Sequence, residues 1–514
     1  MKPRIVLATL NARYSHASFG LRYLLANLGP WRSETRMREF TIHQPPLEIV
    51  ERLLDDDPTL IGLGIYIWNL TETTAIMRLL RALRPDLTLV IGGPEVSYEY
   101  EGLEAFQLAD HLIPGEADLA FRQLVDDLSA GERPPKVIDA PLPDVTALEL
   151  PYDLYSDLDL AQRLIYVEAS RGCPFRCEFC LSSLDIPVRT FDLDRFLTAL
   201  AGLLERGARA FKFVDRTFNL NVKHSAAILQ FCLDHHRDGF ELHFEMIPDR
   251  LPPELRTLLE RFPPGAVQLE IGIQTLSPEV SKRISRPLNF PRIEENFRYL
   301  RANTGAHLHA DLIFGLPGEP LESFGEGFNR LLDLDPDEIQ VGILKRLRGT
   351  PISRHTVPFA LVFSPDPPYE VLETGAVPFA TLQRMKRFAR YFDLYHNSGN
   401  FLETLRMLLE AGPSPFDAFL RFSDWLYGQS AQTHQFSLSR LCLVLFRFLV
   451  DELGLEPASV AERLIRDYDR HVVRRERLEF LKPYAPTIAA PATPTGSLHG
   501  QKRRGKSSTP SHPP

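Results

Sequence analysis

The sequence EASRGCPFRCEFC, residues 168–180, sets three cysteines at a C-x3-C-x2-C spacing. Thiols this close together indicate metal ligands, because the chain has only five cysteines and an odd number cannot all pair as disulfides. Three soft ligands on one loop suit three irons of a 4Fe-4S cluster and leave the fourth iron open to a substrate or cofactor. We therefore predict that Cys173, Cys177 and Cys180 hold such a cluster.

A structural zinc site is the alternative use of this loop. Zinc in such sites takes four Cys or His ligands at similar spacing. The closest histidine, His224, lies more than forty residues beyond Cys180, so the spacing favours the iron-sulfur cluster. The other two cysteines, Cys232 and Cys442, stand in apolar, helix-like stretches and are predicted to be small buried hydrophobic side chains.

Apolar runs alternate with helix-length segments around and after the cysteine loop. The cysteines directly follow the first of these runs. Six strand-helix units predict a partial, open β/α barrel, whose site lies at the carboxyl ends of the strands. The predicted strands are Leu164–Glu168, Ala210–Val214, Glu241–Met246, Val267–Ile273, Leu308–Phe314 and Glu338–Leu344.

An earlier series of the same kind occupies residues 1 to about 130. Its alternation predicts an open, parallel, doubly wound sheet, on which ligands bind outside the carboxyl ends of the strands. The loops after the strands are therefore the places to look for a site. The predicted strands are Arg4–Thr9, Leu60–Ile67, Thr88–Gly92 and Asp110–Pro114, and the helices between them include Phe19–Leu28, Leu47–Asp55 and Leu70–Leu83.

Composition changes along the chain predict an α/β protein of four parts. A proline-rich connection, residues 134–151, lies between the two strand series, and helical runs rich in Phe, Leu and Arg begin at about residue 352. The end of the chain is rich in Pro, Thr, Ser, Ala and Gly, which predicts disorder. The predicted parts are a doubly wound, flavodoxin-like domain (1–140), a partial β/α barrel (141–351), a mostly helical domain (352–483) and a disordered tail (484–514).

Overall composition limits the classes of function that the chain can have. The chain has 514 residues, 44% of them hydrophobic, and a formal charge of -9, which disfavours a nucleic-acid-binding body. The longest apolar run, Leu441 to Val450, is far shorter than the roughly 20 residues of a bilayer span. The first residues lead into a predicted strand rather than a signal-peptide core, so we expect a cytoplasmic protein without an integral membrane segment.

The cysteine loop resembles the signature of the radical S-adenosylmethionine (SAM) superfamily. The matching features are the spacing, the aromatic Phe179 before the last cysteine, and the preceding strand. The resemblance implies that the open iron binds SAM and that one electron cleaves SAM to methionine and a 5'-deoxyadenosyl radical. Three later stretches are similar to strand-end motifs of that superfamily: FVDRTFN at 213–219, LEIGIQ at 269–274 and DLIFGLPGE at 311–319.

These motifs imply positions that contact SAM. Asp215, in place of the more common Glu, faces the SAM amino group in this resemblance, and the stretch around Gly315 closes over the adenine. For Glu245 and Arg286 a solvated barrel rim is the alternative. The residues implied to bind SAM are Phe179, Asp215, Glu245, Gln274, Gly315 and Pro317.

A doubly wound domain ahead of the barrel resembles the cobalamin-binding members of the superfamily. Three motifs carry this resemblance: SFGLRYL at 18–24, GGPEVS at 92–97 and ADHLIPGEAD at 109–118. Adjacent glycines let the backbone lie against a bulky, flat ligand that a Cβ atom would obstruct. The residues implied to bind cobalamin are His16, Ser18, Gly20, Tyr66, Trp68, Asn69, Gly92, Gly93, Gly115 and Glu116.

The first domain departs from the cobalamin pattern in two places. The Asp-x-His-x-x-Gly loop that donates a cobalt ligand is absent, and His16 has one residue too many before Gly20. His16 is therefore either a cobalt ligand or a loop histidine that only forms hydrogen bonds. Tyr66, Trp68 and Asn69 replace the usual small hydroxyl residues and either pack on the corrin face or fill the end of the sheet.

The resemblance implies an enzyme that uses a 4Fe-4S cluster, SAM and cobalamin, most often as a methyltransferase acting on an unactivated carbon. Oxidation and rearrangement are open alternatives. Methylthiotransferases that modify RNA or protein hold a second cluster in the N-terminal domain, and here no cysteine precedes Cys173. The third hypothesis is a cobalamin or redox sensor whose barrel has lost its catalytic activity. It is disfavoured because all three cysteines of the loop are present. We expect a small-molecule substrate and a one-electron donor such as flavodoxin or ferredoxin.

Overall fold

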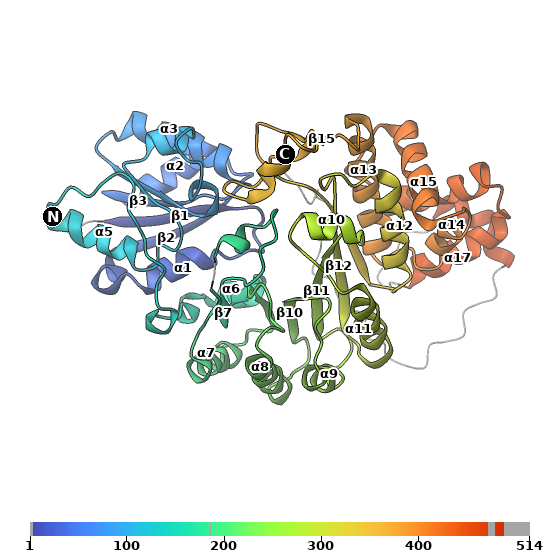
Figure 1. The fold of residues 1–514 in the computed structure, drawn as a ribbon, viewed down its shortest axis with the longest axis horizontal. Helices are drawn as coiled ribbons and strands as arrows, with labels where there is room; N and C mark the ends of the chain where they lie inside the picture. The colour runs from blue at the N-terminus through green and yellow to red at the C-terminus, as the bar shows by residue number, and fades with distance from the viewer. Residues whose placement is uncertain (1–3, 186, 471–477, 488–514) are drawn as a thin grey trace.

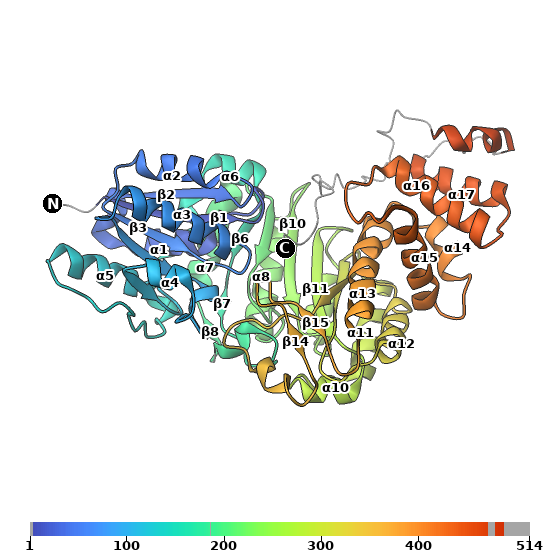
Figure 2. The ribbon, with the colours of Figure 1, turned by 90° about the horizontal axis from the view of Figure 1, so that it is seen from above.

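The computed structural model describes residues 4–185, 187–470 and 478–487. Figure 1 shows two sheets and a helical region in chain order: the N-terminal sheet at one end, the barrel sheet in the middle and the C-terminal helices at the other end. Figure 2 shows the same order from above. The predicted fold class is thus confirmed.

The N-terminal sheet has the order β2-β1-β3-β4-β5, and all its strands are parallel. This order is that of flavodoxin-like doubly wound folds. Separate buried apolar clusters pack on its two faces. The strands are β1 (Ile5–Asn11), β2 (Thr35–Thr41), β3 (Leu60–Gly64), β4 (Thr88–Gly92) and β5 (His111–Ile113), and the helices are α1 (Phe19–Ala26), α2 (Pro46–Leu54), α3 (Leu70–Leu83), α4 (Glu104–Leu108) and α5 (Ala120–Ser129).

Strand β2 is missing from the sequence prediction, which has four strands in this region. It pairs in parallel with β1 and forms an edge of the sheet. Its sequence, TRMREFT, carries charged residues and few buried positions. An edge strand buries little apolar surface, so it lacks the continuous apolar run by which the central strands were recognised.

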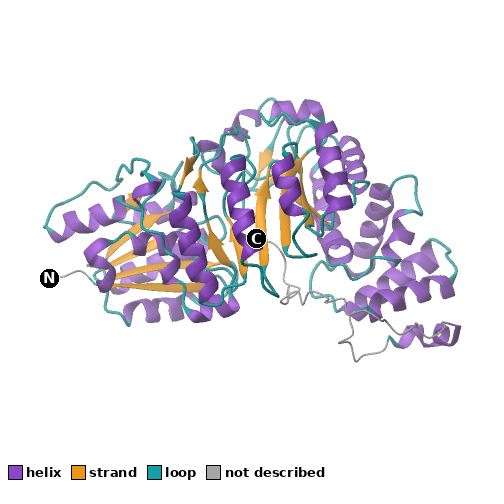
Figure 3. Ribbon diagram, turned by 90° about the horizontal axis from the view of Figure 1, so that it is seen from below, coloured by secondary structure: helices purple, strands orange, loops and turns teal. Residues whose placement is uncertain are grey.

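The barrel sheet has six parallel strands in the order β13-β12-β11-β10-β9-β6. Its edge strands, β6 and β13, do not pair with each other among the described residues, so the barrel is open, as predicted. Figure 3 shows helices covering the outer face of this sheet. The strands are β6 (Ile165–Val167), β9 (Ala210–Phe213), β10 (Glu241–Met246), β11 (Val267–Gln274), β12 (His307–Phe314) and β13 (Glu338–Ile343).

Burial alternates along the barrel strands. On β12, every second residue is buried against the helices, and the residues between them are half-buried on the inner face. The outer layer carries the apolar side chains, so polar residues are left for the interior of the barrel. The helices of this region are α6 (Asp157–Gln162), α7 (Leu193–Glu205), α8 (Val222–Asp234), α9 (Pro253–Leu259), α10 (Pro278–Arg283), α11 (Phe290–Asn303) and α12 (Leu321–Leu332).

The C-terminal helices cover the open edge of β13. Asn397, in a π-helical turn (Asp393–Asn397) that follows α13, accepts from the Ile339 amide and donates to the Ile339 carbonyl, both at 3.0 Å. The Asn397 side chain thus makes the two hydrogen bonds with Ile339 that a neighbouring strand would make. The helices are α13 (Phe379–Phe392), α14 (Thr404–Leu409), α15 (Pro415–Ser430), α16 (Leu438–Arg447) and α17 (Pro457–Asp469).

Buried side chains of the barrel and of the C-terminal helices form one continuous apolar cluster. The tail predicted to be disordered from residue 484 falls mostly outside the described residues, although residues 484–487 end a 3-10 helix (Glu479–Thr487). Among the described residues, no helix combines the length and apolar character that a membrane crossing requires.

Candidate functional site

The cysteine loop leaves the barrel directly after β6. A two-residue antiparallel pairing of β7 (Ser170–Arg171) with β8 (Arg189–Thr190) closes its base. Gly172 has a φ of +89°, and a Cβ atom there would lie 2.7 Å from the Pro187 carbonyl oxygen. Glycine is therefore required at this turn, since it gives the chain a left-handed conformation and a close backbone contact.

The three thiols lie near one another. Cys173 and Cys177 are buried and Cys180 is half-buried. Burial raises the pKa of the Cys173 thiol, and the nearby thiols of Cys180 and Cys177 raise it further. Arg286 donates to the Cys177 sulfur at 3.1 Å and to the Gly272 carbonyl at 2.5 Å, so a cation from the barrel rim stands beside the thiols.

The donor set fits the predicted cluster. Within the described part of the chain, no three His, Cys, Asp or Glu side chains are arranged to hold a single metal ion. A cubane cluster needs a different arrangement, in which each thiolate binds its own iron, and three thiols with a cationic neighbour satisfy it.

Of the residues implied to bind SAM, Asp215 lies at the end of β9 and is fully buried. Its carboxylate accepts from the Ala169 amide at 3.0 Å and from the Ser170 hydroxyl at 2.6 Å. Burial raises the pKa of this carboxyl to about 6. Asp215 therefore anchors the start of the cysteine loop, which is a role that the sequence prediction did not include.

The other implied SAM residues lie on three neighbouring strands or in the cysteine loop. Glu245 on β10 forms an ion pair with Arg216 at 3.2 Å, and Gln274 ends β11 with a φ of +70°. Gly315 has a φ of +89°, and a Cβ atom there would lie 2.7 Å from the Val371 side chain. Phe179 packs partly against the apolar core, and the Pro317 carbonyl accepts from Arg283.

The inner face of the barrel sheet carries a charged network that sequence reasoning missed. His309 stands between Asp311 at 3.1 Å and Glu338 at 3.2 Å. Burial lowers the pKa of His309, but the two carboxylates outweigh this effect and raise that pKa to about 10. The only sequence signal was the alternation of polar residues along β12, which becomes meaningful once that face is known to point inward.

A second part of this network centres on Glu270 of β11. It accepts from His243 at 2.7 Å and pairs with Lys212 at 3.1 Å. Burial opposes ionisation, but the hydrogen bond from His243 and the charge of Lys212 hold the pKa of Glu270 well below its usual range. The interior of the barrel is therefore polar and charged, which suits a polar bound molecule.

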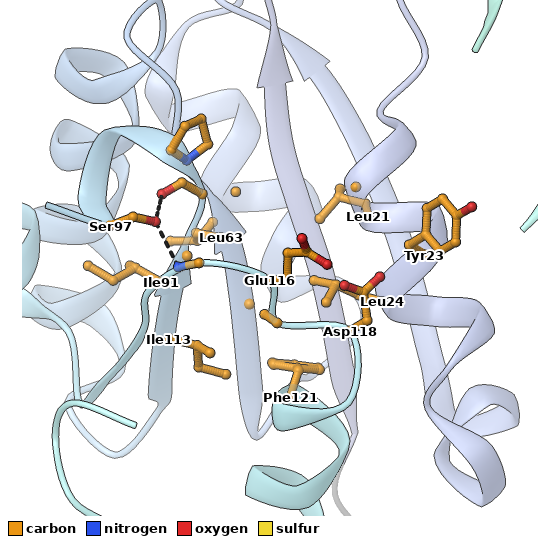
Figure 4. A pocket seen from close by; sticks show the side chains of 18 of the residues that line it. Leu21, Tyr23, Leu24, Leu63, Ile91, Ser97, Ile113, Glu116, Asp118 and Phe121 are labelled. Atoms are coloured by element: carbon orange, nitrogen blue, oxygen red, sulfur yellow. Dashed lines mark hydrogen bonds between the residues drawn. The ribbon is translucent and has the colours of Figure 1, made fainter. Parts of the chain in front are cut away.

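A cavity of about 360 Å³ lies at the carboxyl end of the N-terminal sheet and extends between the sheet and helices α1 and α5. Figure 4 shows Leu21 and Leu24 of α1 and Phe121 of α5 beside it. Its lining is largely apolar side chains and backbone. Six of the residues implied to bind cobalamin line it: Gly20, Tyr66, Gly92, Gly93, Gly115 and Glu116.

Backbone geometry opens this cavity. Gly93 has a φ of +111°, and a Cβ atom there would lie 2.4 Å from the Ile65 carbonyl oxygen. The Ser97 hydroxyl donates to the Gly93 carbonyl and accepts from the Gly115 amide, both at 2.9 Å (Figure 4). The loops after β4 and β5 are thus joined through one serine, which the GGPEVS motif contains.

The other four implied cobalamin residues do not line the cavity. Ser18 caps α1, and the fully buried Asn69 donates to the Leu10 carbonyl at 3.0 Å. Trp68 stacks on Tyr66 with ring centroids 4.5 Å apart. These three residues shape the end of the sheet, which is one of the two roles left open for Trp68 and Asn69.

His16 lies at the junction of the two sheets. Its Nδ1 atom is 2.6 Å from the hydroxyl of Tyr166 on β6, and burial lowers the pKa of its imidazole. The cationic side chains of Arg13 and Lys212 lower this pKa further. His16 therefore faces the inside of the barrel as a neutral imidazole.

The cysteine loop forms part of the wall of the N-terminal cavity. Arg171 and Leu181, from the two ends of the loop, both line it. Arg171 pairs with Glu116 at 2.8 Å and Asp118 at 2.9 Å, and its guanidinium lies 4.4 Å from the Tyr23 ring centroid. The two predicted sites thus adjoin. They are joined by Arg171, two residues before the first cysteine, which sequence reasoning did not single out.

Three family models match the chain in succession. They are the B12 binding domain at residues 5–125, the radical SAM superfamily at residues 167–331, and a protein family of unknown function, DUF4080, at residues 358–488. The chain thus combines a B12-binding domain, a radical SAM domain and a DUF4080 domain, in agreement with the resemblance found in the sequence.

Two curated relatives carry the name methyltransferase. The uncharacterized methyltransferase PH0819 of Pyrococcus horikoshii is 24% identical over 59% of this chain and 70% of its own length. The cobalamin-dependent radical SAM methyltransferase TokK of Streptomyces tokunonensis is 23% identical over 66% of this chain. This chain spans only 57% of TokK.

A solved structure shares the fold along almost the whole chain. The cobalamin-dependent SAM radical enzyme OxsB, with aqua-cobalamin bound, superposes with a TM-score of 0.62 at 15% identity. The match covers 95% of this chain and 84% of OxsB. At this identity the likeness establishes the arrangement of the elements and no more.

Proposed function

We propose that this chain, in which a B12-binding domain precedes a radical SAM domain, is a cobalamin-dependent radical SAM methyltransferase. The observation that carries the proposal is the shared wall: Arg171 and Leu181 belong to the cysteine loop and also line the cavity of the B12-binding domain. A methyl carrier in that cavity would lie beside the cluster that generates the radical. The substrate is a small molecule methylated at an unactivated carbon.

Each cofactor has a proposed set of residues. Cys173, Cys177 and Cys180 hold the 4Fe-4S cluster, and the cavity of the N-terminal domain holds cobalamin. When bound, the cluster, SAM and cobalamin supply the 5'-deoxyadenosyl radical and a methyl group for transfer. The proposed SAM residues are Phe179, Asp215, Glu245, Gln274, Gly315 and Pro317, and the proposed cobalamin residues are Gly20, Tyr66, Gly92, Gly93, Gly115 and Glu116.

The surrounding side chains position these groups. Asp215 fixes the backbone at Ala169 and Ser170, and Arg286 places a cation against the Cys177 sulfur. A hydrogen bond to a cluster thiolate stabilises added negative charge and raises the reduction potential of the cluster. The charged inner face around His309 and Glu270 would bind and orient a polar substrate inside the barrel.

The proposal includes a partner and a compartment. A one-electron donor such as flavodoxin or ferredoxin reduces the cluster, since radical generation consumes an electron that the chain itself does not supply. The formal charge of -9 is unsuited to nucleic acid and supports a small-molecule substrate. An oxygen-sensitive cluster operates in a reducing compartment, which for this chain is the cytoplasm.

The test is anaerobic reconstitution with iron, sulfide and hydroxocobalamin, followed by metal analysis and visible spectroscopy. We expect about four irons and one cobalt per chain, and production of 5'-deoxyadenosine from SAM under reduction. The control is the chain in which all three loop cysteines are alanine. Four irons without cobalt would overturn the cobalamin part, and 5'-deoxyadenosine from the control would overturn the cluster assignment.

A further inference from the structure

One segment after the barrel touches both predicted cofactor sites. Residues 346–355, which we call the strap, follow β13 and lead to the DUF4080 domain. Figure 1 shows this gold stretch lying between the N-terminal sheet and the barrel. One end of the strap contacts the loop after β4, which forms part of the cavity wall, and the other contacts the cysteine loop.

At its first end, the strap holds the loop that contains the adjacent glycines. Arg348 pairs with the buried carboxylate of Glu95 at 2.9 Å, and the Tyr369 hydroxyl donates to the same carboxylate at 2.6 Å. Arg346 pairs with Glu99 at 2.6 Å, and the Gly349 amide donates to Glu99 at 3.1 Å. Two carboxylates of one short loop are therefore both tied to the strap.

Gly349 brings the strap against the cavity wall itself. Its φ is +79°, and a Cβ atom there would lie 2.4 Å from Cγ of Tyr98. Tyr98 lines the cavity. Any movement of the strap towards Tyr98 at this point therefore displaces a side chain that lines the cavity, because Gly349 already lies close against it.

At its second end, the strap holds Glu178, the residue that directly follows the second cysteine. The Glu178 carboxylate is 2% exposed, accepts from His355 at 2.7 Å, and forms an ion pair with Arg354. The Ile352 amide donates to the Glu178 carbonyl at 2.9 Å. The Ser285 hydroxyl donates to the same carboxylate at 2.6 Å, so every part of Glu178 is held.

Burying a carboxylate among several charged partners costs free energy of desolvation. Such a group is therefore not needed merely to hold a loop closed. It does fix geometry, because each partner restricts the carboxylate to one position. Glu178 and Phe179 are the two residues between Cys177 and Cys180. The position of Glu178 therefore restricts where these two sulfurs lie relative to each other.

We propose that the strap couples the cobalamin cavity to the cysteine loop, with Arg348 and Glu178 as its positioning residues. This inference rests on the proposed function, since it assumes both cofactors. Occupancy of the cavity fixes the loop after β4, the loop fixes the strap, and the strap fixes Glu178 between the two cysteines. Coupling of this kind is reciprocal, so the cluster also tightens the binding of cobalamin.

The test measures hydroxocobalamin affinity by visible titration of the full-length chain, with and without its reconstituted cluster. We expect the cluster to tighten binding about fivefold or more, and Glu178→Gln to bring this ratio close to one while about four irons remain. The reciprocal measurement is the reduction potential of the cluster with and without cobalamin. It should shift in the natural chain and not in Glu178→Gln.

Arg348→Gln is the second variant, and it is informative even if Glu178→Gln does not hold iron. Arg348 touches no cysteine, yet its loss should change the electron paramagnetic resonance spectrum of the reduced cluster. Gly349→Ala should weaken cobalamin binding through Tyr98. Its matched control is Gly131→Ala, because Gly131 has a similar φ of +82° and no atom within 4 Å of an added Cβ.

The outcomes separate the coupling from the proposed function. If neither the natural chain nor any variant binds both iron and cobalt, the proposed function fails. If both cofactors load and the affinity ratio is one in the natural chain, the coupling is wrong. The coupling is also wrong if Glu178→Gln and Arg348→Gln keep four irons, the natural ratio and the natural spectrum.

Discussion

The two sheets of this chain place their sites at the same structural position and build them from different materials. In both, the strands are parallel and the site lies at their carboxyl ends. The N-terminal cavity is lined by apolar side chains and by backbone, including Gly93, where an added Cβ atom would collide with the chain. The barrel site is formed by thiols, carboxylates and imidazoles. The cavity therefore depends on a glycine that lacks a side chain, and the barrel site depends on side chains with reactive or charged groups.

This difference predicts opposite responses to substitution. Removing side-chain atoms should destroy the barrel site and leave its fold intact, because the cysteines contribute ligands and little packing. Adding a single methyl group at Gly93 should destroy the cavity, because a Cβ atom there has no room. The predictions below test this contrast in order of decreasing effect.

The largest effect is expected from Cys177→Ala. Loss of one of three thiolates should prevent the cluster from assembling, so that bound iron falls to near zero and formation of 5'-deoxyadenosine falls at least about a thousandfold. Metal analysis and product chromatography measure both. Far-ultraviolet circular dichroism should match that of the natural chain; a variant that is unfolded would show that the thiol has a structural role instead.

Gly93→Ala should nearly abolish cobalamin binding. Its added Cβ would lie 2.4 Å from the Ile65 carbonyl oxygen at a φ of +111°, so the loop after β4 must move. The strained backbone alone costs about 1–3 kcal/mol. Gly131→Ala again serves as the control, since it shares the left-handed φ without the collision. Equal cobalamin affinity in the two variants would show that the cavity is not built as described.

Glu319→Gln should change the pH dependence of stability. Burial raises the pKa of the Glu319 carboxyl to about 7, from an ordinary value of 4.5. Within the described residues, only Thr275 donates a hydrogen bond to it, at 2.6 Å. The folded state therefore keeps a proton that the unfolded state releases. The free energy of unfolding should fall as pH rises from about 4.5 to about 7, by about 3 kcal/mol in total.

The variant should lose this part of the pH dependence and be the more stable protein above pH 7, because glutamine stays neutral. Urea unfolding at pH 5 and pH 8, for both proteins, measures the effect. If the two proteins lose the same free energy between these pH values, Glu319 is ionised in the fold at neutral pH and its proposed protonation is wrong.

The smallest effect is expected at the covered edge of the barrel. Asn397→Ala removes both hydrogen bonds to Ile339 and leaves two buried backbone groups unpaired, which should cost about 2 kcal/mol. Asn397→Asp keeps an acceptor for the Ile339 amide and loses the donor. It also brings a buried carboxylate against the Ile339 carbonyl. Thermal unfolding should therefore show both variants to be destabilised. Unchanged melting of Asn397→Ala would mean that water serves this edge equally well.

The contrast between the sites also explains which predictions from sequence succeeded. The six barrel strands were predicted close to their observed positions, because each is a run in which buried apolar residues recur at short intervals. The cysteine loop was recognised by residue type and spacing, and the glycine loops by their place after strands. Strand β2 was missed because an edge strand with alternating charges has no such run.

The residues predicted for the cobalamin site lie in different surroundings. Glycines of the predicted loops line the cavity, but Ser18 and Asn69 instead cap a helix and bind backbone inside the sheet end. A polar residue near a site looks the same in sequence whether it faces a ligand or the chain. Burial and hydrogen-bond partners decide between these roles, and both depend on residues far away in the sequence.

By itself, the sequence determined the two strand-helix series, the cysteine loop after the first barrel strand and the glycines in the loops after strands, because each is a local pattern of residue types. Only the tertiary structure decided that Arg171 joins the loop to the cavity, that Glu178 is held by residues about 175 positions later, and that polar residues of five strands meet inside the barrel. These contacts join distant parts of the chain, and no local pattern encodes which distant residue a side chain will meet.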